Sequence, residues 1–516
     1  MEVVVLGLFV VFSVLIASWA LKTVYLLWLK PMKMKKYLKK QGIDGPSYKL
    51  FNGNFKELVM MRIEARSKPM ELSHRIVPRL LPFEDQSVKT YGKMFVSWIG
   101  STPRVNIMDP EMIRDILSNK FGHFAKVKSN PLGELLAKGV VSYQGEKWVK
   151  HRRIINPAFH QEKLKVMLPA FYACCSELIE KWEKLISDES CEVDVWPYLQ
   201  NLTADVISRT AFGSSYEEGR RIFELQTEQA KLVVESGRSI YIPGFRFVPT
   251  KRNRRMKEIF REVSTLLREM INNREKAMKF GKASADDLLG ILMESNLKEV
   301  KDGSNAKNFG MSIDEIIEEC KLFYFAGQET TSTLLVWTMI VLSMHPEWQV
   351  KAREEVIEVF GRKKPDFEGL NHLKVVTMIL NEVLRLYPPV IMLTRVTYKT
   401  IELGNIRLPP DVELALPILL VQHDPELWGK DAEEFNPERF SEGVSKATKN
   451  QVSFLPFSYG PRFCIGQNFA LVEAKMALAM ILQKFSFELS PTYTHAPSTV
   501  LILQPQHGAP LILHKL

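Results

Sequence analysis

The sequence predicts a mainly α-helical protein with a small β portion, preceded by a single transmembrane helix. Three observations support this fold class. The chain begins with a long uncharged apolar run, helical patterns dominate the rest, and strand-like segments are few and short. Of the 516 residues, 46% are hydrophobic and 25% are charged. This ordinary globular composition excludes wholesale disorder, a collagen-like rod and a coiled coil.

The amino-terminal run is long enough to cross a bilayer. No charged side chain occurs from Val3 to Leu21, and the apolar character resumes after Lys22 through Leu29. Crossing a bilayer needs roughly 20 apolar residues. A cleaved signal peptide is the competing interpretation, but it usually has a basic start and a small-residue cleavage site, which this chain lacks. We therefore predict a transmembrane anchor over residues 1–29.

The segment 30–46 is predicted to be a basic flank and hinge. Asp44-Gly45-Pro46 is typical of a turn. The flank has six lysines with no acidic residue among them: Lys30, Lys33, Lys35, Lys36, Lys39 and Lys40. The positive-inside rule places such a flank in the cytosol. We therefore expect a single-pass protein that contacts membrane lipid, with residues 47–516 in the cytosol.

Net charge and cysteine count exclude two further classes of protein. The net charge of +10 suggests nucleic acid, an anionic membrane or an acidic partner. The first 40 residues carry +6 of it, and no basic region is interleaved with aromatic residues, so we predict no nucleic-acid partner. Five cysteines in so long a chain do not form a disulfide framework, and their odd number leaves at least one thiol free.

No linker or repeat divides residues 47–516, so one large body is predicted. Charged amphipathic patterns predict helices at Arg254–Lys279, Ala352–Phe360 and Val375–Leu386. Short β-prone runs predict strands at Phe95–Ile99, Arg104–Ile107, Thr394–Tyr398 and Val412–Leu416.

The most unusual predicted helix begins at Ser312, which forms a capping-box pattern with Glu315, and continues to His345, before Pro346. Its middle is nearly apolar all round, which suits either a second membrane span or a helix through the centre of a large protein. Glu329 interrupts the apolar stretch, and a charge at mid-span is costly. A central helix is therefore the better interpretation.

A loop rich in glycine and proline surrounds one cysteine. The run Phe457–Gly466 contains Cys464, and a helical pattern from Asn468 to Lys484 follows at once. The thiol is thus expected near a helix amino end with Arg462 close by, and both features lower a thiol pKa. A thiolate is either a nucleophile or a metal ligand. The plain alternative is a buried small hydrophobe.

The pattern Phe-x-x-Gly-x-Arg-x-Cys-x-Gly in this loop resembles the haem-binding signature of the cytochrome P-450 monooxygenases. The resemblance implies haem b, with Cys464 as the proximal iron ligand. It also implies that Phe457 packs beside the ligand loop and that Arg462 pairs with a haem propionate. The haem is then expected between the long central helix and the cysteine loop, which makes residues 47–516 a haem-binding catalytic domain.

The segment Ala326-Gly327-Gln328-Glu329-Thr330-Thr331 matches the oxygen-activation motif of the same family. Gly327 is expected to open a local groove for oxygen. The Thr330 hydroxyl can bond a backbone carbonyl or bound dioxygen. Glu329 offers a carboxylate for proton relay, so both residues are predicted to be catalytic. The alternative is a surface-facing glutamate beside a back-bonded threonine.

Further motif residues occur in the family's order. Glu382 and Arg385 lie on one helical face, where a surface salt bridge is the usual meaning. With Arg439 of the Asn436–Phe440 segment, the resemblance instead implies a buried structural network. The remaining matches are Trp148, Arg152 and Arg395, which it assigns to the haem propionates. His151 and Arg153 are nearby, so the choice of Arg152 rests on motif spacing.

By the same resemblance, parts of the chain far apart in sequence line a substrate pocket. The implied pocket residues are Phe325, Ala326, Val390 and Leu393, within the wider segments Phe121–Lys138, Leu232–Phe247, Val390–Thr394 and Ser498–Leu501. Their apolar content suits a hydrophobic terpenoid. The whole-chain pattern is similar to a plant clan that oxidises terpenoids, with a triterpenoid favoured and an iridoid or gibberellin-type substrate as alternatives.

The resemblance implies a monooxygenase of the endoplasmic reticulum membrane. Electrons are expected from NADPH through a partner NADPH–cytochrome reductase, because no glycine-rich dinucleotide fingerprint occurs in the chain. The alternatives are a haem-thiolate isomerase or dehydratase that does not use O2, and a non-catalytic haem-binding protein. A membrane-anchored cysteine hydrolase is a further alternative. It would need His151, His160 or His423 near the cysteine.

Overall fold

The computed structural model describes residues 2–119, 122–128, 130–186, 189–214, 216–238, 240–280, 287–301, 310–448 and 451–516. Its α-helices are α1 (Glu2–Val24), α2 (Lys30–Lys39), α3 (Phe55–Ser67), α4 (Val77–Leu80), α5 (Pro82–Tyr91), α6 (Pro110–Ser118), α7 (Gly145–Ile155), α8 (Gln161–Leu185), α9 (Val195–Phe212), α10 (Tyr216–Ser236), α11 (Lys251–Lys279), α12 (Leu288–Lys301), α13 (Ile313–Met344), α14 (Pro346–Phe360), α15 (Phe367–His372), α16 (Lys374–Leu386), α17 (Ile418–Gln422), α18 (Pro425–Trp428) and α19 (Gln467–Lys484). Its strands are β1 (Met94–Ile99), β2 (Thr102–Ile107), β3 (Phe124–Ala125), β4 (Ser190–Asp194), β5 (Leu393–Thr397), β6 (Ile401–Leu403), β7 (Ile406–Leu408), β8 (Glu413–Leu416), β9 (Phe485–Leu489), β10 (Pro497–Val500), β11 (Ile502–Pro505) and β12 (Pro510–Lys515).

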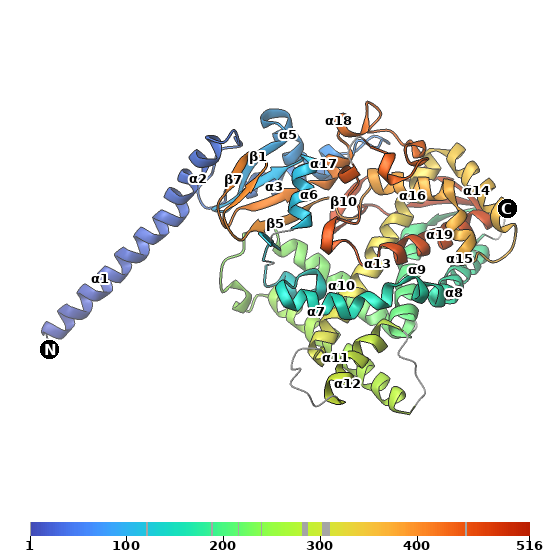
Figure 1. Cartoon of the computed structure of the whole chain (residues 1–516), viewed down its shortest axis with the longest axis horizontal. Helices are drawn as coiled ribbons and strands as arrows, with labels where there is room; N and C mark the ends of the chain where they lie inside the picture. The colour runs from blue at the N-terminus through green and yellow to red at the C-terminus, as the bar shows by residue number, and fades with distance from the viewer. Residues whose placement is uncertain are drawn as a thin grey trace.

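The amino-terminal segment forms one helical arm that projects from the body (Figure 1). Helices α1 and α2 are joined by a π-helical turn at Tyr25–Leu29. Within the described residues, one helix, from Val4 to Lys39, is long and apolar enough to cross a membrane, and none of its apolar window is buried in the body. The Tyr37 hydroxyl and the Gln41 side chain both donate to the Arg407 carbonyl, each at 3.0 Å. The arm is therefore attached to the body beside β7.

The segment that follows the arm packs closely on the body. Leu38 and Ile43 are fully buried in the main core. Gly45 lies against strand β1, where an added Cβ atom would fall 1.9 Å from the Val96 carbonyl oxygen. The Val96 amide also donates to the Asp44 carbonyl at 3.0 Å. The division at residues 29 and 46 stays a prediction, but these contacts fix the predicted hinge segment against the sheet.

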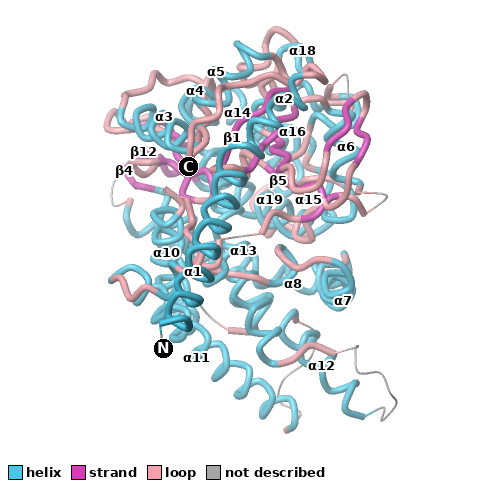
Figure 2. Tube along the Cα trace, turned by 90° about the vertical axis from the view of Figure 1, so that its left-hand side faces the viewer, coloured by secondary structure: helices cyan, strands magenta, loops and turns pink. Residues whose placement is uncertain are grey.

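All four predicted strands lie in one five-stranded sheet of order β1-β2-β8-β5-β3. Strands β2 and β8 pair in parallel, and the other neighbours are antiparallel. The five-stranded sheet lies on the side of the body nearest the arm, whereas the carboxyl terminus, directly after β12, lies on the far side (Figure 1). Helices α7, α8, α11 and α12 lie below the labelled strands in Figure 2. The predicted mainly α class with a small β portion is therefore confirmed.

Helix α13 runs through the centre of the molecule, as the sequence predicts (Figure 1). The Ser312 hydroxyl accepts from the Glu315 amide at 3.3 Å, and the Glu315 carboxylate accepts from the Ser312 amide at 3.0 Å. This reciprocal capping box begins the helix, and Pro346 begins α14 directly beyond it. The middle of α13 is buried against protein, because α9, α16 and α19 pack around it.

Helix α19, which follows the cysteine loop, carries a buried acid. Glu473 is 1% exposed. Both of its carboxyl oxygens are buried without a hydrogen-bond partner among the described residues. Burial raises the pKa of this carboxyl well above its ordinary value, and the Thr331 hydroxyl of α13 offsets only part of the rise. Burial therefore favours the uncharged form of Glu473.

Substitution of Glu473 by Gln should change how stability depends on pH. A raised pKa means that the folded state binds the proton more tightly than the unfolded chain, so this acid destabilises the fold increasingly above about pH 4.5. The thermal midpoint of Glu473→Gln should therefore gain on that of the wild type as the pH rises from about 5.5 to about 8. Exposed Glu358→Gln is the control. A difference that does not vary with pH would contradict the assignment.

Candidate functional site

The cysteine loop has a conformation that only part of its sequence reveals. Ser458 and Gly460 have φ values of 65° and 71°, in the left-handed region. An added Cβ atom at Gly460 would fall 2.5 Å from the Leu117 carbonyl oxygen, so this position requires glycine. The Cys464 amide donates to the Phe457 carbonyl at 2.9 Å and closes the loop. Phe457 is half-buried against the core beneath.

Cys464 is exposed at the surface of this loop, whereas Cys174, Cys175 and Cys320 are buried. The sequence predicted a lowered thiol pKa, and this prediction is wrong. The protein atoms packed around this accessible thiol desolvate it and raise its pKa, and the Gly466 amide and Arg152 lower the pKa only in part. A coordinated metal ion deprotonates a thiol outright, so metal ligation does not require the free thiol to be acidic.

Trp148 and Arg152, two residues of α7 that were predicted to bind the cofactor, flank the cysteine loop. Arg152 donates to the Phe463 carbonyl at 3.0 Å and lies over the Phe463 ring. Arg462, which the sequence placed near the thiol, instead stacks its guanidinium 4.5 Å from the centre of the Trp148 ring. These contacts bring three of the predicted residues together along one edge of the cysteine loop.

Arg395 of β5 and a residue missed from the sequence, Lys126, complete a group of four cations with Arg152 and Arg462. A cavity of about 440 Å³ is lined by Lys126, Arg395, Arg462 and Trp148. Burial and the neighbouring arginines lower the pKa of Lys126 to about 7. Burial and Arg462 lower that of Arg395 to about 10. In the part of the chain that the structure describes, no carboxylate forms an ion pair with any of the four.

These four cations show whether the residues of the site are suited to binding haem. Like charges buried together are unfavourable unless an anion joins them. A cofactor with acidic side arms would supply that anion, while the Cys464 thiol nearby would bind its metal. Lys126 was missed because its place depends on the pairing of β3 with β5, which carries Arg395. No local pattern in the sequence predicts the pairing of β3 with β5.

The motif of the central helix is only partly as predicted. The Thr330 hydroxyl donates to the Ala326 carbonyl at 2.8 Å and remains half-exposed, as both sequence interpretations allow. Glu329 is 6% exposed, so the alternative of a surface glutamate is wrong. Burial raises the pKa of Glu329 to about 7, and Lys231 of α10 partly opposes this.

The role predicted for Gly327 is wrong. An added Cβ atom at this position would fall 2.7 Å from Cγ1 of Ile207 in α9. The missing side chain therefore allows α9 and α13 to approach closely and does not open a groove for oxygen. The Thr203 hydroxyl of α9 bonds the Gln328 carbonyl at 2.9 Å at the same contact.

The predicted buried network is assembled around one carboxylate. Arg385 and Glu382 are fully buried and form two hydrogen bonds of 2.7 Å. Arg385 also donates to the carbonyls of Gln422, Ala432 and Glu434. Arg439 lies 3.4 Å from Glu382 and also bonds Asp431 and the Trp428 carbonyl. The network thus ties α16 to the segment before the cysteine loop.

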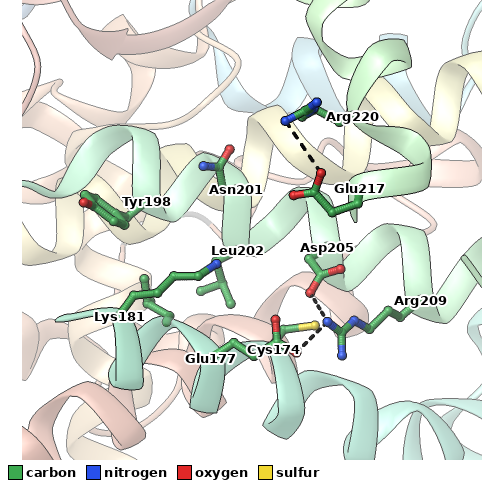
Figure 3. A pocket seen from close by; sticks show the side chains of 11 residues that line it. Cys174, Glu177, Lys181, Tyr198, Asn201, Leu202, Asp205, Arg209, Glu217 and Arg220 are labelled. Carbon is green, nitrogen blue, oxygen red and sulfur yellow. Dashed lines mark hydrogen bonds and ion pairs between the residues drawn. The ribbon is translucent and has the colours of Figure 1, made fainter. Parts of the chain in front are cut away.

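The implied pocket residues Phe325, Ala326, Val390 and Leu393 are all half-buried. Residues 121, 129 and 239 of the wider segments lie outside the described residues. A separate cavity of about 370 Å³ lies between α8, α9 and α10 (Figure 3). It contains none of the predicted site residues, and Arg209 there is paired with Glu177 and Asp205.

Two of the histidines considered for a cysteine hydrolase are engaged elsewhere. The His151 ring bonds Glu319 at 2.6 Å. The His423 ring bonds the Leu386 carbonyl at 3.0 Å. The geometry around Cys464 instead suits a cofactor that has both a metal centre and acidic side arms. Haem is such a cofactor, and the arrangement defines a haem-thiolate protein.

The chain belongs to the cytochrome P-450 family, whose model matches residues 82–512. It is 61% identical to cytochrome P-450 CYP72A616 of Paris polyphylla, over 99% of each chain. It is 57% identical to cytochrome P-450 72A13 of Arabidopsis thaliana, over the full length of both. It is 54% identical to the 11-oxo-beta-amyrin 30-oxidase of Glycyrrhiza uralensis, over 99% of this chain and 98% of the relative.

These likenesses confirm several predictions. The chain is a plant-type cytochrome P-450 with the fold of that family, it uses haem, and its enzyme class is monooxygenase. Its apolar amino-terminal helix is consistent with a membrane anchor. The roles of the individual site residues stay predictions.

Substitution of Arg385 by Leu should destabilise the fold strongly. It would leave the Glu382 carboxylate buried without its main partner, at a cost of about 3–5 kcal/mol. Arg255→Leu is a matched control, because Arg255 makes the same two-bonded pair with Glu228 at the exposed surface. Loss of the Arg255–Glu228 pair should lower the free energy of unfolding by about 1 kcal/mol or less. Urea unfolding followed by circular dichroism measures both. Equal losses in the two variants would contradict a special role for the buried network.

Proposed function

We propose that this protein uses NADPH and O2 to hydroxylate or further oxidise a hydrophobic plant terpenoid, with a triterpenoid as the favoured substrate. The observation that carries the proposal is the 54% identity, over nearly the whole chain, to a relative named for oxidation of 11-oxo-beta-amyrin. β-Amyrin has a triterpenoid skeleton. The half-buried apolar side chains of Phe325, Ala326, Val390 and Leu393 suit such a ligand.

The residues of this chain have separable tasks in the proposed reaction. When bound, haem supplies the redox-active iron at which O2 is used. Cys464 is the ligand that donates electron density to that iron. Lys126, Arg152, Arg395 and Arg462 neutralise the propionates. The apolar pocket side chains orient the substrate and exclude water.

Proton supply is assigned to the central helix. The Thr330 hydroxyl is held by the Ala326 carbonyl at 2.8 Å, which fixes its rotamer. Glu329 is buried, and its pKa of about 7 lets it both hold and release a proton near neutral pH. The positive charge of Lys231 in α10 partly offsets the rise in the pKa of Glu329.

Electrons are proposed to come from a membrane-bound NADPH–cytochrome reductase at the endoplasmic reticulum. The sequence has no dinucleotide fingerprint of its own, and the helical arm supports attachment to the same membrane. The lysines that follow the apolar run favour a cytosolic body.

The function is tested with microsomes that contain the full chain and a plant reductase. Triterpenoid, iridoid and gibberellin-type scaffolds are supplied with NADPH, and products are identified by mass spectrometry. We expect oxidised triterpenoid, and Cys464→Ser should give none. The reduced, carbon-monoxide-bound spectrum should show the red-shifted thiolate band for the wild type but not for this variant. Oxidation of another scaffold alone would overturn the substrate class, and absence of the band in folded protein would overturn the haem-thiolate assignment.

Thr330→Ala should retain haem but divert reducing equivalents from product to peroxide. The matched control is Thr338→Ala, because Thr338 makes the same bond to a carbonyl four residues earlier in α13 but is fully buried. Glu329→Gln should also lower the product formed per NADPH. In the wild type this ratio should fall as the pH rises through about 7, since an ionised Glu329 cannot donate. Unchanged coupling in Thr330→Ala and Glu329→Gln would reject these roles.

A further inference from the structure

A buried pair, His151 of α7 and Glu319 of α13, joins these two helices next to Arg152. Nδ1 of His151 lies 2.6 Å from Oε1 of Glu319, and both side chains are fully buried. Neither residue belongs to the groups assigned above to haem, oxygen or substrate. Because a buried carboxylate is unfavourable unless it is well bonded, we looked for the role of this pair in the groups that surround it.

The second oxygen of Glu319 holds the backbone that precedes α7. The Val140 amide donates to Oε2 at 3.0 Å. Gly139 has a φ value of 72°, and an added Cβ atom there would fall 2.5 Å from the same oxygen. The 139–140 backbone is therefore pressed onto the carboxylate, and one side chain of α13 fixes both this loop and His151.

His151 is surrounded by charged and polar groups from each neighbouring element. Its Nε2 atom lies 3.6 Å from Glu315 of α13, which also pairs with Lys147 of α7 at 2.8 Å. The Tyr143 ring meets the His151 ring edge-on, with centres 4.7 Å apart. The imidazole therefore bridges Glu319 to the loop residue Tyr143.

Tyr143 and α7, which contact His151 or contain it, also hold two of the four cations, Arg462 and Arg152. The Tyr143 carbonyl accepts from Nη2 of Arg462 at 2.6 Å. Arg152 is the next residue after His151 and donates to the Phe463 carbonyl at 3.0 Å. Both arginines are thus held by backbone that the histidine–glutamate pair fixes in place.

We propose that Glu319 and His151 form a clamp that positions Arg152 and Arg462 for the haem propionates. They are positioning residues, because neither touches the cofactor-binding cavity. The clamp acts through the Val140 amide on one side and through Tyr143 and α7 on the other. Its loss should loosen haem retention and lower the reduction potential, since cations near the propionates favour the reduced iron.

The experiment uses the full chain loaded with haem, in nanodiscs, and does not depend on the substrate. Haem transfer to excess apomyoglobin gives the dissociation rate, and a redox titration gives the midpoint potential. His151→Leu and Glu319→Leu should each release haem at least about tenfold faster, because each leaves a buried partner unbonded. The double variant should release haem no faster than the worse single one, since the two residues act as a unit.

Three further variants separate positioning from general destabilisation. His151→Asn keeps a donor for Glu319 and should stay within about twofold of the wild type. Glu319→Gln keeps the volume but loses the charge and one acceptor, and should release haem about threefold faster. His495→Leu removes an equally buried histidine that bonds the Ser73 carbonyl far from the cations, and should change neither quantity.

The outcomes decide the proposal in either direction. Faster haem loss with a more negative potential in His151→Leu, together with rescue by Asn, supports the clamp. Wild-type values in His151→Leu, or equal effects of His495→Leu, would overturn it. If the Leu variants yield no haem protein, Glu319→Gln decides, and wild-type haem loss in that variant would overturn the proposal.

Discussion

The unbalanced positive charge at one edge of the cysteine loop is the constraint on which the site depends. Lys126, Arg152, Arg395 and Arg462 come from a loop, a helix, a strand and the cysteine loop, so the whole fold is needed to gather them. Among the described residues no carboxylate pairs with them. Such a group is favourable only with an anion in place. The haem propionates are proposed to supply that anion, so binding of the cofactor would stabilise this part of the fold.

Elsewhere in the core, buried acids are made tolerable in two different ways. Glu382 is paired with Arg385 and Arg439, and backbone carbonyls satisfy the remaining donors of the arginines. For Glu473 and Glu329, burial raises the pKa and favours the uncharged form. Paired charge suits a rigid joint, since breaking it is costly. A carboxyl with a pKa of about 7 can exchange its proton near neutral pH, which suits the proton-relay role proposed for Glu329.

Sequence reasoning succeeded where the signal was local. The capping box at Ser312, the stop at Pro346 and the glycine–proline loop around Cys464 are each written in a few adjacent residues. It failed where a distant segment decides the outcome. Gly327 faces Ile207 of α9, and the pKa of the Cys464 thiol depends on how closely distant segments pack around it. Lys126 belongs to the site only because β3 pairs with β5.

Helix α13 connects the two sides of the site as one rigid element. Glu319 and Thr330 are eleven residues apart, so they lie about 16 Å apart along the helix axis. The first fixes the loop and helix that hold Arg152 and Arg462, and the second carries the hydroxyl that is proposed to supply protons. A close-packed helix cannot bend to serve each end separately, because α9, α16 and α19 surround it. The position proposed for the cofactor's acidic edge and that of the hydroxyl proposed to supply protons are therefore set together by the packing of a single helix.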